Sequence, residues 1–168
     1  TNNSDRGGIY SSKSSTINNN TAGVVVGGES NVTGPGGYYQ GVFAGQSNTA
    51  QGINSAIFAG TNNQTTSAAD RSAIIAGQSN TISNDTSVIA GGTSNSISSA
   101  SAFVGGGTQN TNNQTFGAMV GGRNNTIGSN AGDASTIIGG RDNGISNNTA
   151  GRYNAIYNSY SSQINGVS

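Results

Sequence analysis

Charged residues, histidine, cysteine, tryptophan and proline are scarce or missing in this chain, and the lack of charge, histidine and cysteine excludes several classes of protein. Charged residues make up 7% of the 168 residues, against roughly 25% in typical globular domains. There is no histidine and no cysteine, which excludes Ser-His-Asp and Cys-His catalysis and zinc sites of the usual kind. The formal net charge is zero, so the chain lacks the basic patch that nucleic-acid binding needs.

Long apolar runs are also missing. No run approaches the roughly 20 residues needed to cross a bilayer, so we expect no direct membrane insertion. No signal peptide is visible, and the chain begins at Thr1 rather than at Met. We therefore interpret it as a mature fragment or a domain excised from a longer fibre. The lack of cysteine fits an oxidising or a reducing compartment and decides nothing between them.

What fills the chain is a repetitive mixture of small and polar residues. There are 28 glycines, and Gly, Asn, Ser and Thr together make up more than half of the chain. Such a composition is typical of disorder, but disordered chains usually carry a net charge. Here the apolar residues recur in short runs at a regular interval. That regularity favours a fold built by repetition.

Each repeat unit combines a short apolar run, a Gly-containing turn, an Asn and an Ile. Its clearest copy covers residues 88–97 (VIAGGTSNSI), and the Asn recurs at intervals of 15 to 18 residues. The eight Asn positions are Asn31, Asn48, Asn63, Asn80, Asn95, Asn110, Asn125 and Asn143. Weaker copies at residues 9–17 and 156–164 have Ser in place of Asn, as expected where a solenoid ends or changes its cross-section.

The length of the repeat predicts the fold class. A period of about 15 residues is too short for a helical repeat and suits a coil of two short strands and two tight turns. Val, Ile and Phe dominate the apolar runs, which favours strands, and the Gly pairs favour turns. The sequence therefore predicts an all-β, parallel β-roll or β-solenoid of about ten coils. We expect residues 1–7 to form a lead-in, 8–165 the roll and 166–168 a C-terminal end.

Two adjacent columns of apolar residues run down the aligned repeats. The first is aliphatic in every copy and includes Ile57, Ile74 and Ile89. The next column, which includes Phe43 and Phe58, is also mostly apolar, although neighbouring residues of a strand point to opposite faces. We therefore expect both faces of this strand to be buried. Since a coil has one interior, further copies of the same chain must cover the second face, and we expect a homotrimer.

Side-chain volume is balanced across that second face. The second column shrinks to Ala90 and Gly105, and there the residue two positions earlier grows to Val88 and Phe103. Elsewhere the earlier position is mostly Gly, Ala or Thr, and residues two apart share a face. This compensation is typical of a close-packed surface.

We interpret the Asn column as structural. Asn suits tight turns and bonds to neighbouring backbone, and stacked amides can form a hydrogen-bonded ladder. A further column closes the coil from the second strand. It consists of Ile17, Ile82, Ile97, Ile127, Ile145 and Ile164, with polar replacements at Thr33, Thr65 and Asn112.

The run from Ser87 to Ile97 resembles the head repeats of trimeric autotransporter adhesins and related repeats of phage and bacterial surface fibres. The resemblance extends over roughly residues 8–165. It implies a left-handed parallel β-roll with three chains around one axis, displayed extracellularly on a cell surface or on a phage or viral fibre. The bulky apolar pairs, the doubled Gly and the Asn depart from the family's unit, which usually has Ser or Ala in place of Asn.

The sequence predicts no enzyme activity, no metal site and no cofactor. The carboxylates lie in different repeats, at Asp5, Glu29, Asp70, Asp85, Asp133 and Asp142. Calcium-binding β-rolls place an Asp in each Gly-rich turn, whereas these turns carry Asn, Ser, Thr or Gln. The Gly105–Gly107 run lacks the spacing of a phosphate-binding loop, and we interpret it as a repeat turn.

Tyr38 and Tyr39 lie in the only segment that contains Pro, residues 34–40 (GPGGYYQ). We interpret this segment as a loop that bulges from the roll. Exposed aromatic side chains favour recognition, so the two tyrosines are the candidate ligand-binding site for a glycan or protein receptor. The alternative is that they cover a coil edge or pack against a neighbouring protomer. Further loops are expected near residues 68–71 and 130–133.

Together these features predict a non-enzymatic trimeric fibre head or adhesin tip that attaches to a host cell, prey or surface. One alternative is an ice-binding solenoid, because a partial ladder of hydroxyl residues follows the Asn column. Its members are Thr16, Thr49, Thr81, Ser96, Thr111 and Thr126, with interruptions at Val32, Gln64, Gly144 and Gln163. A polysaccharide lyase or hydrolase is another alternative, but such β-helix enzymes need clustered acids or bases and a larger coil.

Overall fold

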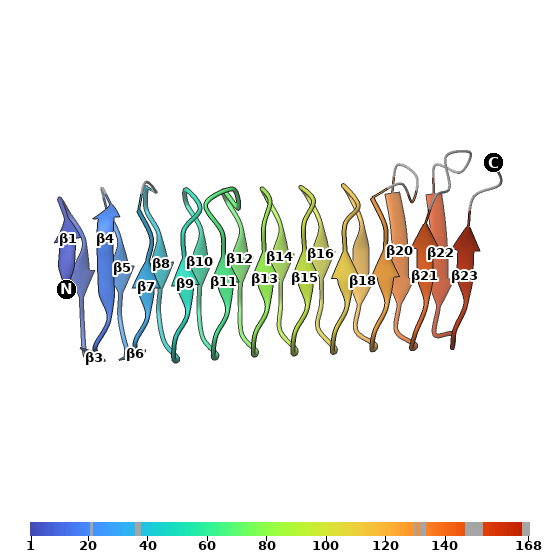
Figure 1. Ribbon diagram of the computed structural model, residues 1–168, viewed down its shortest axis with the longest axis horizontal. Coiled ribbons are helices and arrows are strands. Elements are labelled where there is room, and N and C mark those ends of the chain that lie inside the picture. Colours follow the sequence, from blue (N-terminus) through green and yellow to red (C-terminus); the bar gives the residue numbers. More distant parts are fainter. Residues whose placement is uncertain (21, 36–37, 130, 132–133, 147–152, 166–168) are drawn as a thin grey trace.

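The computed structural model describes residues 1–20, 22–35, 38–129, 131, 134–146 and 153–165. These residues form an all-β parallel solenoid of about nine turns with a period of about 16 residues. The turns stack into a long rod with β1 at one end and β23 at the other (Figure 1). The predicted all-β solenoid is confirmed. The prediction of about ten coils counted ten copies of one strand, and the structure has ten strands in that sheet. Ten successive strands span about nine full turns of the solenoid.

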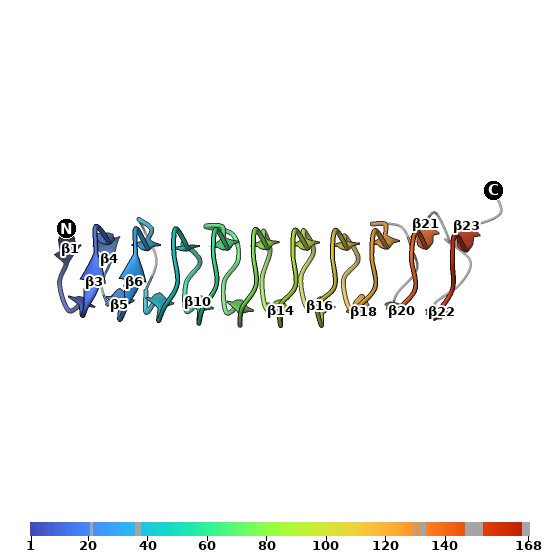
Figure 2. The ribbon, with the colours of Figure 1, turned by 90° about the horizontal axis from the view of Figure 1, so that it is seen from below.

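Two parallel sheets form opposite sides of the rod (Figure 2). The eleven-stranded sheet contains β1 (Asn2–Ser4), β4 (Thr16–Asn20), β7 (Val32–Thr33), β9 (Thr49–Ala50), β11 (Gln64–Thr65), β13 (Thr81–Ile82), β15 (Ser96–Ile97), β17 (Thr111–Asn112), β19 (Thr126–Ile127), β21 (Gly144–Ser146) and β23 (Gln163–Asn165). The ten-stranded sheet contains β2 (Gly8–Ile9), β5 (Val24–Val25), β8 (Gly41–Val42), β10 (Ala56–Ile57), β12 (Ala73–Ile74), β14 (Val88–Ile89), β16 (Phe103–Val104), β18 (Ala118–Val120), β20 (Ala134–Ile138) and β22 (Tyr153–Tyr157).

The sheet begins earlier than the repeat predicted. β1 lies within residues 1–7, the expected lead-in, and it pairs in parallel with β4. The predicted C-terminal end, residues 166–168, lies outside the described residues.

A third ladder runs along one of the connections between the two sheets, where the two-strand prediction had only a turn. It starts with β3 (Ser12–Lys13) and β6 (Gly28–Glu29), which pair in parallel. Single bridges then continue it through Glu29, Gln46, Thr61, Gln78, Thr93, Thr108, Arg123, Arg141 and Tyr160. The coil therefore has a third hydrogen-bonded side.

The interior is filled by two of the predicted columns, the aliphatic column of the first strand and the Ile column of the second strand. Ile57 and Ile74 from the ten-stranded sheet, and Ile82 and Ile97 from the eleven-stranded sheet, are fully buried. Each pair is in register across successive coils. Full burial of such a side chain stabilises the fold by about 1.5–3 kcal/mol, so the stacked columns are the main source of stability.

The three polar replacements in the Ile column of the eleven-stranded sheet do not open the core. Thr33, Thr65 and Asn112 are all fully buried. The Thr65 hydroxyl donates to Ser55 Oγ at 3.1 Å, and the Asn112 amide donates to the Phe103 carbonyl oxygen at 3.3 Å. Because buried polar groups are costly only when they lack partners, these substitutions are accommodated.

Gly77 shows why the turn after the apolar run requires glycine. Its φ is +105°, and a Cβ there would collide with the carbonyl oxygen of Gly92 in the next coil. The residue before the Asn also adopts a left-handed conformation, as at Ser94 with φ 56°. The turn therefore contains two left-handed residues, of which sequence analysis had identified only the glycine.

The predicted loop at residues 68–71 is tied to the coil. Ala69 is fully buried, and the Asp70 carboxylate accepts a hydrogen bond from the Ile53 backbone amide at 2.7 Å. Of the other predicted loop, residues 130, 132 and 133 lie outside the described residues, and Ala131 is buried.

Candidate functional site

The Asn column lies inside the turn, where its amides connect successive coils. The backbone amide of Asn95 donates to Asn80 Oδ1 at 2.9 Å. Its side-chain amide donates at 3.1 Å to the carbonyl oxygens of Gly91 in its own coil and Gly107 in the next. The same pattern recurs along the column, and all eight asparagines are buried. Their polar groups are used within the fold, which leaves no surface for a ligand.

The outer face of the ten-stranded sheet carries a line of exposed hydrophobic side chains, which we call the apolar stripe. It consists of Tyr10, Val26, Phe43, Phe58, Ile75, Phe103, Val120, Ile138 and Tyr157. At β14 the half-buried Val88 stands in the line in place of an exposed member. Charged residues do not interrupt this line. Scattered exposed hydrophobic residues are normal, but a contiguous apolar patch marks an interaction surface.

The sequence predicts that further copies of the chain cover this face, and in the single chain the stripe is exposed. In the single chain its side chains are between 38% and 67% exposed, with Val26 and Ile138 lowest and Tyr157 highest. The inward column is buried because the coil closes over it. No other part of the described chain covers the outward one.

The predicted volume compensation has a direct geometric basis on this face. The ring of Phe43 lies over Gly41, where a Cβ would be 3.0 Å from it, and the ring of Phe103 lies over Gly105, at 3.3 Å. Phe43 and Phe58 also stack with ring centroids 5.1 Å apart. Large side chains therefore fill the space left by glycine on either side, and the stripe keeps a level surface.

Tyr39 lies beside the stripe and lines an apolar hollow of about 310 Å³ together with Val24, Phe43 and Ala56. Tyr38 and Tyr39 are 50% and 64% exposed, and Tyr39 has a left-handed φ of 56°. Residues 36 and 37 of the same predicted loop lie outside the described residues. The structure therefore brings Tyr39 and the stripe together into one apolar surface.

Phe116 is an exposed aromatic residue that sequence analysis missed. It is 64% exposed and has a φ of 60°. Like Tyr39, it lies two residues before a strand of the ten-stranded sheet. Aligning the repeats on that strand, rather than on the Asn, would have placed the two aromatics in one column.

The outer face of the eleven-stranded sheet is polar instead. Thr81, Ser96, Thr111 and Thr126 follow one another in register on four successive coils. Adjacent strands lie about 4.8 Å apart, so these hydroxyl groups form a regular row. Gln64 precedes the row and Gly144 ends it.

Three of the described carboxylates lie in ion pairs. Glu29 pairs with Lys13 at 3.0 Å, Asp85 with Arg71 at 3.5 Å, and Asp142 with Arg141 at 2.8 Å. Exposed pairs of this kind add little stability. Within the part of the chain that the structure describes, no three His, Cys, Asp or Glu side chains come together to hold a metal ion. Asp133 lies outside that part.

No protein-family model matches the chain, and no curated protein matches it either. The resemblance of the repeats to adhesin heads therefore remains a prediction. In the described residues, no helix has the length and apolar character to cross a membrane. Function must therefore be inferred from the surfaces of the solenoid.

Proposed function

We propose that this chain is a non-enzymatic subunit of a trimeric fibre head or adhesin tip. In this proposal three parallel copies, each a left-handed roll, surround one axis outside a cell or on a phage or viral fibre. The assembly attaches its bearer to a host cell, prey or surface through a glycan or protein receptor. A rigid rod of uniform coils suits this role, because it presents side chains at fixed heights along its length.

The apolar stripe is the observation that carries the proposal. It extends from Tyr10 in β2's coil to Tyr157 in β22, and so covers the full height of the ten-stranded sheet. An apolar surface of this kind is stabilised by removal from water. A second copy of the chain offers a stripe of the same length and the same spacing, and closed cyclic symmetry satisfies all copies equally.

The narrowness of the sheet favours three copies over two. Most strands of the ten-stranded sheet are two residues long, so the face is only about 7 Å wide along the strand direction. Three narrow faces can converge on a common axis without collision between the flanking turns. Broad flat sheets instead pack face to face in pairs.

The position of Tyr39 favours one of its two predicted roles. Because it shares an apolar hollow with Phe43 of the stripe, a neighbouring copy on the stripe would also cover Tyr39. We therefore place Tyr39 at the proposed interface. Tyr38, which is half exposed, stays the candidate contact with a receptor.

Light scattering on the purified chain tests the proposal. The expected mass is three times the 16.6 kDa of one chain. Phe58→Asp puts a charge in the stripe and should yield a folded monomer, whereas Thr81→Asp on the opposite sheet should stay trimeric. A wild-type monomer would overturn the proposal, and a dimer would retain the interface but overturn the three-fold arrangement.

The in-register hydroxyl row supports ice binding as a second candidate function. Four successive coils carry Thr81, Ser96, Thr111 and Thr126 on one outer face. A flat repeating row of this kind is the feature that such a surface needs. A thermal hysteresis assay at high protein concentration decides the matter, because a protein without this activity leaves the freezing point of its solution at the colligative value.

A further inference from the structure

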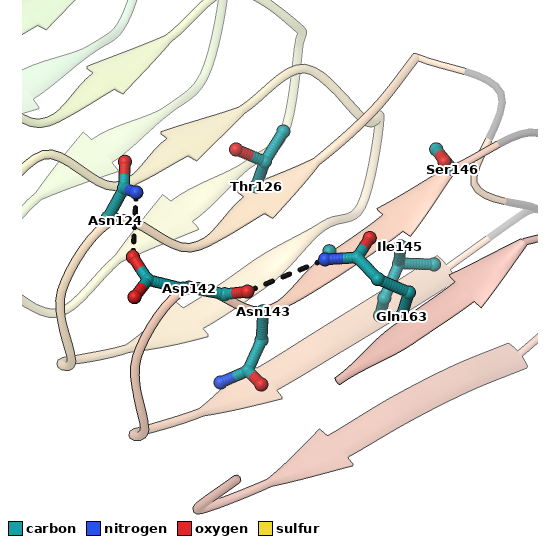
Figure 3. Close-up of a pocket in the computed structure, with 8 residues that line it drawn as sticks. Asn124, Thr126, Asp142, Asn143, Ile145, Ser146 and Gln163 are labelled. Carbon is teal, nitrogen blue, oxygen red and sulfur yellow. Dashed lines mark hydrogen bonds between the residues drawn. The ribbon is translucent and has the colours of Figure 1, made fainter. Parts of the chain in front are cut away.

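The hydroxyl row ends in a polar recess of about 330 Å³ on the outer face of the eleven-stranded sheet (Figure 3). The recess lies across β19, β21 and β23. The polar residues that line it are Asn124, Thr126, Asp142, Asn143, Ser146 and Gln163. This face points away from the ten-stranded sheet and its apolar stripe (Figure 2), so stripe-mediated assembly leaves the recess open.

Gly144 lies beneath one wall of the recess, which the side chain of Gln163 forms. The register places Gly144 between Thr126 on one side and Gln163 on the other. Every other position of this outward column from Thr16 to Gln163 has a side chain. The carboxamide of Gln163 lies over the vacant place, close to where a Cβ of residue 144 would be. It also donates to the backbone oxygen of Asp142 at 3.4 Å.

The Asp142 carboxylate at the edge of the recess is held in one orientation. Asn124 Nδ2 donates to Oδ1 at 2.7 Å, and Arg141 Nε donates to Oδ2 at 2.8 Å. Arg141 in turn lies 5.2 Å from the centre of the Tyr160 ring. Because each carboxylate oxygen has further lone pairs, Asp142 can still accept a hydrogen bond from a ligand. Its partners position it before the ligand arrives.

We propose that this recess binds one pyranose ring of a surface glycan. Sugar hydroxyls both donate and accept, and the recess offers a fixed carboxylate as acceptor together with amide and hydroxyl groups of both kinds. The exposed side chain of Thr126 provides a methyl group for the C–H face of the ring. The volume suits a small ligand.

The same geometry argues against other ligands. A cation would need several oxygen ligands, whereas both oxygens of the single carboxylate already accept from N–H donors. A peptide would need a deep apolar pocket for an anchor side chain, and six polar residues line this one. The inference rests on the proposed attachment function and names its ligand class. Each recess is formed within one chain, so sugar binding does not require the trimer.

The test is titration of the wild-type chain with glucose, galactose, mannose, fucose and N-acetylglucosamine, followed by backbone amide shifts in NMR. A monosaccharide should bind with a dissociation constant of order 1 mM, and the shifts should centre on Thr126 and Gly144. Gly144→Thr continues the hydroxyl row and displaces the Gln163 carboxamide from its place in the wall of the recess, and only the end of the Gln163 side chain must move. We expect it to fold as the wild type does and to lose binding.

Asp142→Asn should weaken binding about ten-fold, whereas Asp85→Asn, which alters a comparable Arg-paired carboxylate outside the recess, should leave it unchanged. Binding that survives Gly144→Thr, or absence of binding by every sugar, overturns the inference. The mass measurement keeps the two proposals separate. A trimer that binds no sugar retains the fibre head alone, and a monomer that binds sugar through the recess retains the recess alone.

Discussion

Phe43 and Phe58 stack on the outer face of the ten-stranded sheet with ring centroids 5.1 Å apart and ring planes at 11°. They follow Val42 and Ile57, which are in register on adjacent strands and face the core. Since neighbouring residues of a strand point to opposite faces, each of these strands builds the interior with one residue and the apolar stripe with the next. The stripe therefore has the same regular spacing as the core.

Removal of this stack should weaken the trimer far more than the fold. Aromatic hot spots at the centre of an interface cost about 2 kcal/mol or more when truncated to alanine, so the Phe43→Ala/Phe58→Ala variant should dissociate at protein concentrations about 100-fold higher or more than the wild type. Within one chain the stacked pair contributes only about 0.5–1.5 kcal/mol beyond its burial. Sedimentation over a concentration series measures the first effect. Equal dissociation of this variant and a Thr111→Ala/Thr126→Ala control would contradict the assignment of the interface.

The repeat pattern predicted the interior well. The Ile57 column and the Asn95 column were identified from periodicity alone, because a residue repeated at one position in every coil must meet the same environment each time. Burial of these columns is a property of the single coil. Spacing and residue type therefore suffice to place them.

The sequence pattern could not show what depends on neighbours outside the repeat unit. An apolar column at Phe58 indicates a surface that avoids water, but the covering element is another molecule in our proposal. The third ladder through Thr93 consists of single bridges whose residue type varies, so it leaves no pattern. The recess at Gly144 appeared only as an interruption of the hydroxyl row, because its walls come from three different coils.

Asn95→Ala should destabilise the solenoid strongly. The substitution removes two donated hydrogen bonds to Gly91 and Gly107 and the acceptor for the Asn110 backbone amide at 3.0 Å. At about 1 kcal/mol for each bond, with an added cost for buried groups left without partners, the expected loss is more than about 3 kcal/mol. Chemical denaturation measures it. Gln78→Ala, at an exposed position of the third ladder, serves as the control and should change the free energy of unfolding by less than about 0.5 kcal/mol.

Two glycines of the same turn type should respond oppositely to substitution by alanine. Gly77 has a φ of +105° and no room for a Cβ, whereas Gly91 has an ordinary φ and its Cβ would be 4.0 Å from the nearest atom, the Ala76 carbonyl oxygen. Gly77→Ala should cost more than about 1 kcal/mol because the backbone must shift. Gly91→Ala should be neutral or slightly stabilising. Thermal unfolding of both variants checks this, and similar melting temperatures would contradict the turn geometry.

The electrostatic environment of Asp142 predicts a pH-dependent contribution to stability. The hydrogen bond from Asn124, followed by that from Arg141, lowers the pKa of the Asp142 carboxyl below its usual value. A group whose pKa is depressed by folding stabilises the fold at pH values above its unfolded-state pKa of about 3.9, and this contribution is lost as the pH falls through the folded-state pKa. The wild type should therefore be more stable than Asp142→Asn at neutral pH, and the difference should vanish in acid.

Urea denaturation of both proteins over a pH series measures that difference. Asn is compatible with the left-handed φ of 59° at this position, so the substitution changes the charge and leaves the backbone conformation in place. The effect should be small and should shrink at high salt, because the pair is exposed to solvent. Asn124→Ala removes the largest cause of the shift and should reduce the pH-dependent part. A stability difference that stays constant from neutral pH to strong acid would show that Asp142 acts through packing instead.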